Sequence, residues 1–220
     1  MKIAYKDITI RHANSEDAPI LADWWNDGTV MAHAGFPKGL GTTPEKVTAE
    51  LSHDSDDTRR RLILLFQDIP IGEMCFRKVQ RDTADIGIKI CESAYREHGI
   101  GRIALSMLIG YLFDAGCNRI ILDTNPKNSR ARHVYEKLGF RQIRINTDSW
   151  QNQLGQWESS VDYELTRENF INFDVYFVCV KSYCGKFMFG RWRTKSSCTY
   201  NIYIVQFFYT IVVWQRIGYS

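Results

Sequence analysis

One short stretch of the sequence, Arg96-Glu97-His98-Gly99-Ile100-Gly101-Arg102, combines two glycines with three basic side chains. It follows residues 84–90, whose alternation and isoleucine content predict a strand, and precedes residues 103–113, whose apolar residues recur at helical spacing. Glycines let the backbone approach a ligand closely, and the N–H groups of a first helical turn favour an anion. The pattern predicts an anion site at a helix start, although a tight turn packed for steric reasons would carry the same residues.

A second informative stretch runs from Asn125 to Phe140 and predicts a loop followed by a helix. Asn128 can cap that helix, and Tyr135 lies about two turns further on. Tyr135 is offset by one position from the apolar residues expected to face the core, so its hydroxyl can reach the edge of a cleft. The alternative is that Tyr135 packs at the helix surface without a chemical role.

The two stretches together resemble the GNAT superfamily of N-acetyltransferases. The resemblance is carried by Arg96 to Gly101, by Asn128 to Ala131, and by Tyr135 to Phe140, with one helix and one strand between the blocks. It covers roughly residues 7–168. The region before the glycine stretch and a predicted strand at 160–165 are most similar to the subgroup related to ribosomal-protein and aminoglycoside acetyltransferases.

The resemblance implies an α/β (α+β) fold with a mixed, mostly antiparallel central sheet. That sheet would be splayed into a V between strands 84–90 and 119–124, with acetyl-CoA as co-substrate in the V and no metal. The residues implied to contact the cofactor are Ile88, Ile90 and Cys91 for the pantetheine, Arg96, His98, Gly99, Ile100, Gly101 and Arg102 for the pyrophosphate, and Asn128 near the sulfur.

Acetyl transfer to an amine needs a neutral amine and a proton for the departing thiolate. A phenol is a suitable acid for a thiolate, and Tyr135 matches the family's acid position. Glu73 and Asp85, on two predicted strands, are candidate general bases, directly or through water. Either carboxylate could equally be a solvated strand residue, and an amine that arrives partly neutral needs no dedicated base.

The remaining pattern predicts one domain, 1–170, in which strands and helices alternate with short connections. The expected elements are a strand at 3–12, a helix from about 15 to 26, an irregular stretch at 29–41, a helix from 44 to about 53, strands at 61–67, 71–79 and 84–90, a helix at 103–115, a strand at 119–124, a helix at 131–138, and strands at 140–147 and 160–165. The short return from helix to strand implies that 84–90 and 119–124 pair in parallel.

Charge and cysteine usage limit the classes of partner. Residues 171–220 hold six Lys/Arg and one acidic residue, whereas residues 1–170 hold 22 and 24, so the main body is not expected to bind nucleic acid. Cys75, Cys91 and Cys117 lack metal-ligand spacing and predict small buried side chains. The first residues lack the apolar run of a signal peptide, so a reducing cytoplasm is expected.

Residues 171–220 differ in composition from the rest, with 14 aromatic residues in 50 positions. Their longest apolar run, Ile202 to Val213, is too short to span a bilayer, so no integral membrane segment is expected. The segment could be an extra hairpin, a dimerisation or membrane-surface element, or an out-of-frame product joined to the domain. The abrupt change of composition favours the last of these.

The sequence therefore predicts an acetyl-CoA-dependent N-acetyltransferase, a possible homodimer, that acts on a small-molecule amine or a peptide N-terminus. A cationic acceptor would suit the acidic residues near the expected acceptor loops, and two tryptophans could wall its pocket. These residues are Asp23, Asp27, Glu73 and Asp148, and Trp24 and Trp25. One alternative is an acyl-CoA-binding sensor of the same fold without catalysis. A nucleotide-binding protein is weaker, because no Lys-Ser/Thr pair follows Gly101.

Overall fold

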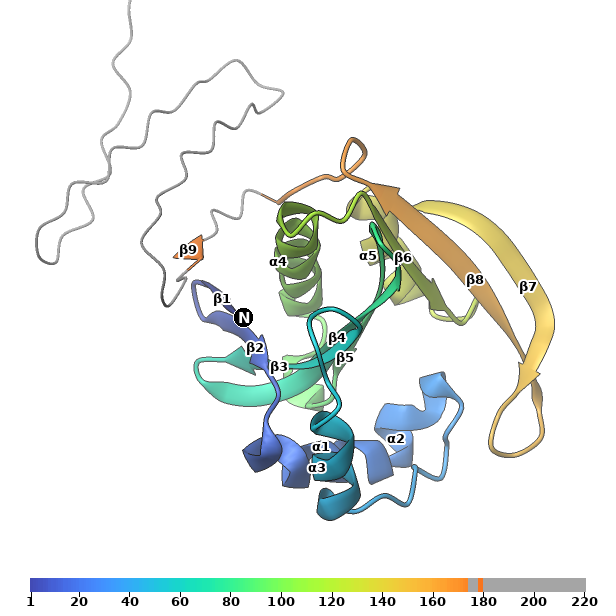
Figure 1. The fold of residues 1–220 in the computed structure, drawn as a ribbon. Helices are drawn as coiled ribbons and strands as arrows, with labels where there is room; N and C mark the ends of the chain where they lie inside the picture. The colour runs from blue at the N-terminus through green and yellow to red at the C-terminus, as the bar shows by residue number, and fades with distance from the viewer. Residues whose placement is uncertain (174–177, 180–220) are drawn as a thin grey trace, which may run out of the picture. The chain divides into compact units, whose positions relative to one another are not determined.

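The computed structural model describes residues 1–173 and 178–179, and these form a single sheet with helices on both faces (Figure 1). The strands are β1 (Lys2–Tyr5), β2 (Ile8–His12), β3 (Arg59–Phe66), β4 (Ile69–Gln80), β5 (Thr83–Ile90), β6 (Arg119–Thr124), β7 (Arg141–Gln151), β8 (Trp157–Thr166) and β9 (Val178–Cys179). The helices are α1 (Ala18–Asn26), α2 (Gly28–Met31), α3 (Pro44–Leu51), α4 (Ile100–Asp114) and α5 (Ser129–Lys137), with 3-10 turns at Ser15–Asp17, Ala32–Ala34 and Ser93–Tyr95.

The strand order β7-β8-β6-β5-β4-β3-β2-β1-β9 is antiparallel except where β5 meets β6. That parallel pair holds over only three positions, Thr83 to Asp85 against Arg119 to Ile121. β5 continues to Ile90 on β4 and β6 to Thr124 on β8, but the two strands no longer pair with each other, so they separate. The predicted fold class and the V-shaped opening are both confirmed.

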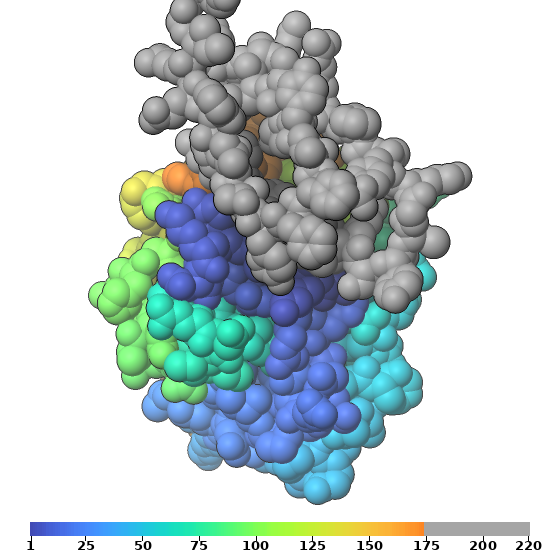
Figure 2. Space-filling model, turned by 90° about the vertical axis from the view of Figure 1, so that its left-hand side faces the viewer, coloured from blue at the N-terminus to red at the C-terminus, as the bar shows by residue number. Residues whose placement is uncertain are grey.

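Two apolar cores lie on opposite faces of the sheet, as the alternation along β3 requires. Leu62 and Leu64 belong to the larger core, which includes α4 and α5, whereas Ile63 and Leu65 belong to the smaller one beneath α1, α2 and α3. Figure 2 shows β1 and the helices of the first 51 residues forming one continuous surface. The larger core therefore holds the V together, and the smaller one anchors the helices in front of it.

Three elements differ from the sequence-based expectation. The strand predicted at 3–12 is the hairpin β1–β2, because the chain turns at Lys6, which has a φ of 50°. The stretch predicted as irregular contains α2 and a 3-10 turn, since the Asp27 carboxylate accepts a hydrogen bond from the Thr29 N–H at 2.7 Å and starts a new helix. The last two strands are longer than predicted and form a projecting hairpin.

The predicted tail, 171–220, lies outside the described residues except at its beginning and at β9. The Ile171 N–H donates to the Leu138 carbonyl at 3.0 Å, and the ring of Phe173 packs against Arg102. The backbone of β9 pairs with β1. The first three residues after position 170 therefore contact the domain.

Candidate active site

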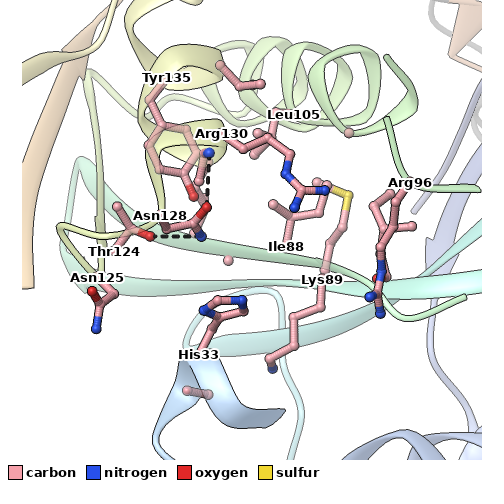
Figure 3. A pocket seen from close by; sticks show the side chains of 18 of the residues that line it. His33, Ile88, Lys89, Arg96, Leu105, Thr124, Asn125, Asn128, Arg130 and Tyr135 are labelled. Carbon is pink, nitrogen blue, oxygen red and sulfur yellow. Dashed lines mark hydrogen bonds between the residues drawn. The ribbon is translucent and has the colours of Figure 1, made fainter. Parts of the chain in front are cut away.

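A cavity of about 940 Å³ fills the opening of the V (Figure 3). One wall is β5 from Ile86 to Ile90, and the other is the end of β6 from Asp123 to Asn125. The starts of α4 and α5 and the 3-10 turn that carries His33 close the remaining sides. The separation of two strands thus creates the space that the cavity occupies.

The glycine stretch leaves the beginning of α4 bare toward this cavity. Gly99 precedes the helix with a φ of 75°, and the first helical bond runs from the Ile103 N–H to the Gly99 carbonyl. The N–H groups of Ile100, Gly101 and Arg102 therefore have no acceptor within the helix. A Cβ added at Gly99 would meet no atom within 4 Å, and one at Gly101 none nearer than 3.9 Å. These open donors fit the pyrophosphate of acetyl-CoA.

Most of the predicted cofactor residues line the cavity. Those that do are Ile88, Ile90, Arg96, Gly99, Gly101, Arg102 and Asn128. Cys91 and Ile100 are buried in the apolar cores, and His98 is exposed outside the cavity. The structure thus brings together seven of the ten residues, and Ile100 stays beside the site through its backbone.

Arg96 holds the end of β5 in place. Its Nε donates to the Ile90 carbonyl at 3.0 Å and its Nη2 to the Cys91 carbonyl at 2.7 Å. These two bonds hold the Arg96 guanidinium against the end of β5. The cationic groups nearer to the helix start are Arg102 and Arg130, and Arg130 forms a 3.0 Å ion pair with Glu97 at the cavity mouth.

Tyr135 is buried in the wall of the cavity, with its ring packed against Phe140 and Tyr163 at centroid distances of 5.8 and 5.7 Å. Its position on α5 is fixed by Asn128, whose Oδ1 accepts from the Ala131 N–H at 3.2 Å (Figure 3). Burial raises the pKa of Tyr135 to about 12, and the nearby Asp123 adds to the rise. The phenol therefore stays protonated at neutral pH and can act as a proton donor.

The two carboxylates predicted as bases are both ion-paired. Glu73 is buried and lies 2.7 Å from the Lys89 Nζ, at the border of the cavity. Asp85 lies 2.8 Å from Arg77 and outside the cavity lining.

Asp123 is a third carboxylate, which the sequence reasoning missed. It lies on β6 between Asp85 of the neighbouring strand and Asp162, its antiparallel partner on β8, and it lines the cavity. Partial removal from solvent raises its pKa although the residue stays exposed at the edge of the cavity, and the negative charges of Asp85 and Asp162 raise it further, whereas Arg77 lowers it. The sequence feature that could have pointed to Asp123 is its place as a single acid directly after the apolar run Ile120 to Leu122, at the end of the strand that opens the V.

Two loops distant in sequence contact one another beside the cavity, where Trp150 lines it. Gln153, between β7 and β8, accepts from the Lys38 N–H at 2.8 Å and donates to the Gly39 carbonyl at 2.9 Å. Beside it, the Trp150 ring lies against Gly35, where a Cβ would come within 2.4 Å of it. We call this set of contacts the clasp.

The predicted tryptophan walls lie elsewhere. Trp24 is buried and donates to Glu92 at 2.9 Å, and Trp25 lines a second, smaller cavity. Of the four acids predicted near the acceptor, only Glu73 lines either cavity. Within the described residues, no helix has the length and apolarity to cross a membrane, and no group of three or more potential metal ligands occurs.

The model of the acetyltransferase (GNAT) domain family matches residues 7–141. N-alpha-acetyltransferase 30 of Saccharomyces cerevisiae is 36% identical over 81 residues, which cover 35% of this chain and 46% of that protein. The chain thus matches about half the length of this curated relative.

Solved structures share the fold. Spermidine N-acetyltransferase from Vibrio cholerae, in complex with CoA and spermine, has a TM-score of 0.65 at 18% identity, over 74% of this chain and 97% of that one. Ribosomal-protein-alanine N-acetyltransferase from Brucella melitensis has a TM-score of 0.62 at 20% identity, over 71% and 98%. With the family match over most of the described residues, these findings establish that the chain belongs to the GNAT acetyltransferase family.

Proposed function

We propose that the protein transfers an acetyl group from acetyl-CoA to a primary amine. The observation that carries the proposal is the pairing, in one cavity, of a protonated phenol with a carboxylate of raised pKa, below a helix start with open N–H donors. Bound acetyl-CoA supplies an activated thioester carbonyl. The helix start and the end of β5 that has separated from β6 hold this co-substrate and leave its acyl end near Tyr135.

The chain's own residues then manage two protons. Asp123 accepts a proton from the incoming ammonium, directly or through water, which leaves the amine neutral for attack. Tyr135 donates its proton to the sulfur as the carbon–sulfur bond breaks, and the second proton that the nitrogen loses as the amide forms returns through water to the Tyr135 phenolate. Asp123 releases its proton to solvent. The raised pKa of Asp123 suits its role, because a more basic carboxylate takes up the proton more readily. The phenol of Tyr135 is protonated at neutral pH, so it has a proton to give. Glu73, predicted from the sequence as a base, is not given that role in the proposal, because its carboxylate is held in an ion pair with Lys89.

The acceptor is proposed to be a small amine or a peptide N-terminus. Support comes from the names of similar proteins, which include a spermidine and a ribosomal-protein-alanine N-acetyltransferase. The three described cysteines are free thiols, compatible with the cytoplasm predicted from the sequence. A homodimer stays a prediction.

The direct test is a panel of amines assayed for thiol release from acetyl-CoA, with wild type and Tyr135→Phe compared. Loss of a general acid lowers kcat by about 10²–10⁴-fold. Acetyl-CoA affinity, measured by fluorescence titration, should be nearly unchanged, because the phenol does not touch the glycine stretch. An unchanged rate in Tyr135→Phe would refute the acid assignment. Tight acetyl-CoA binding without turnover of any amine would favour the sensor alternative.

A further inference from the structure

A second cavity, of about 480 Å³, opens on the same face of the sheet, between β3 to β5 and the helices α1 and α3. Three of its lining residues also line the first cavity: Glu73, Cys75 and Lys89. Because the two cavities share these residues, they are adjacent, with the Glu73–Lys89 ion pair at their common border. A molecule whose amine lies near Asp123 could extend from the first cavity into the second, past the Glu73–Lys89 ion pair.

The second cavity is lined by more cationic than anionic groups. The cationic residues are Lys46, Arg59, Arg61 and Lys89, and the anionic ones are Glu50 and Glu73. Glu50 pairs with Arg61 at 2.6 Å and Glu73 with Lys89 at 2.7 Å, so both carboxylates are already engaged. A further buried acid, Asp54, lies behind the arginines, 3.6 Å from Arg61 and 3.7 Å from Arg59.

Two of the cations remain available to a ligand. Lys46, on the exposed side of α3, makes no ion pair with any described residue. Arg59 has a half-exposed side chain and, among the described residues, only the long contact with Asp54. Arg61 is fixed beneath them, because its guanidinium stacks 4.9 Å from the Trp25 ring centroid and is bonded to Glu50. The ion pairs of Arg61 and Lys89 hold the floor of the cavity in place, and the two uncommitted cations at its edge, Lys46 and Arg59, are complementary to an anion.

We infer that the second cavity binds an anionic group of the acceptor, a carboxylate or a phosphate, several bonds away from the amine that is acetylated. A peptide N-terminus followed closely by an acidic side chain has this chemistry. The inference rests on the proposed function for the identity of the acceptor, but its binding step can be measured without turnover.

The test compares matched tetrapeptide amides on the full chain saturated with CoA: Ala-Glu-Glu-Ala, Ala-Gln-Gln-Ala, and versions with phosphoserine or serine at the second position. Calorimetric titration should show the acidic peptides binding about tenfold more tightly than their neutral partners, as expected for one charge-assisted contact. The ratio of affinities is compared between the glutamate and glutamine peptides and between the phosphoserine and serine peptides. The pair with the larger ratio shows whether the cavity prefers a carboxylate or a phosphate. Lys46→Gln combined with Arg59→Gln should reduce both preferences to within about twofold.

The matched control is Lys2→Gln combined with Arg81→Gln, which removes one exposed lysine and one exposed arginine outside both cavities. It should retain the full preference. Equal binding of acidic and neutral peptides to wild type would overturn the inference, as would a preference that survives in the Lys46/Arg59 variant. If the peptides bind as expected but none is acetylated, the proposed function fails while the inference stands. If the acidic and the neutral peptides are acetylated with equal kcat/KM and bind equally tightly, the inference fails while the proposed function stands.

Discussion

At the scale of single residues, the pKa of Asp123 should set the acid limb of the pH–rate profile. A base must be deprotonated to act, so the rate falls as the pH drops through its pKa. Since that pKa is raised, the fall should occur above the usual range of an aspartate. Asp123→Asn should abolish this limb and lower kcat by about 10²-fold or more.

Asp85→Asn gives a sharper test of the role of Asp123. It removes one of the negative charges that raise the pKa of Asp123 and releases Arg77, whose positive charge lowers it. Both changes lower the pKa, so the acid limb should move to lower pH while the rate at neutral pH stays close to wild type. Profiles of kcat/KM between pH 4 and 8 would show the shift of this limb to lower pH. A profile that does not move in either variant would exclude Asp123 as the base.

At the scale of elements, Gly99 and Gly101 should respond differently to substitution. Gly99→Ala places a side chain at a φ of 75° and should cost about 1 kcal/mol of unfolding free energy. Gly101 lies within α4 with open space beside it, so Gly101→Leu should leave the melting temperature unchanged or slightly higher. The leucine would occupy the cavity, however, and acetyl-CoA affinity should fall at least tenfold. Calorimetry and fluorescence titration separate the two effects, and a Gly101→Leu variant with normal affinity would contradict the placement of the cofactor.

Elements were predictable from the sequence where local signals act alone. The run Ile120 to Leu122 and the Asn128 cap gave β6 and the start of α5 within a residue or two. The β1–β2 turn was not predictable, because Lys6 and Asp7 carry no glycine signal and the turn depends on pairing with β3. Asp123 was missed for the same kind of reason, since its environment comes from strands distant in sequence.

The clasp links elements at opposite ends of the chain, and it should control the acceptor rather than the cofactor. Gln153→Ala removes both side-chain bonds to the loop at 38–39, so the two loops should separate more often. Hydrogen exchange at the Lys38 amide, which donates to the Gln153 side chain, should quicken, and the acceptor KM should rise several-fold, as expected for losing about 1 kcal/mol of positioning. Acetyl-CoA affinity serves as the internal control. Gln156→Ala, in the same hairpin but not bonded to that loop, is a matched control that should behave as wild type.

For the whole molecule, the domain should extend at least to Phe173, three residues beyond the boundary predicted at 170. The Asn172 amide oxygen accepts from the Ser106 hydroxyl at 3.1 Å, and Ser106 is fully buried. The Phe173 ring lies 4.3 Å from the guanidinium of Arg102, which lines the cofactor cavity. Deleting 171–220 therefore leaves a buried hydroxyl without its partner, exposes the core side of Phe170, and frees Arg102, whereas deleting 174–220 keeps all three contacts.

The shorter deletion variant, lacking 174–220, should retain acetyl-CoA binding, and its melting temperature should change only by the loss of the two-residue pairing of β9 with β1. The variant lacking 171–220 should melt several degrees lower, because an unpaired buried hydroxyl costs about 1–3 kcal/mol and each kcal/mol lowers the melting temperature by about 2–4 °C in a domain of this size. Its acetyl-CoA affinity should also fall, since Arg102 loses its support. Equal melting temperatures would show that residues 171–173 contribute nothing. Loss of acetyl-CoA binding in the shorter deletion would mean that the segment beyond Phe173 belongs to the functional domain.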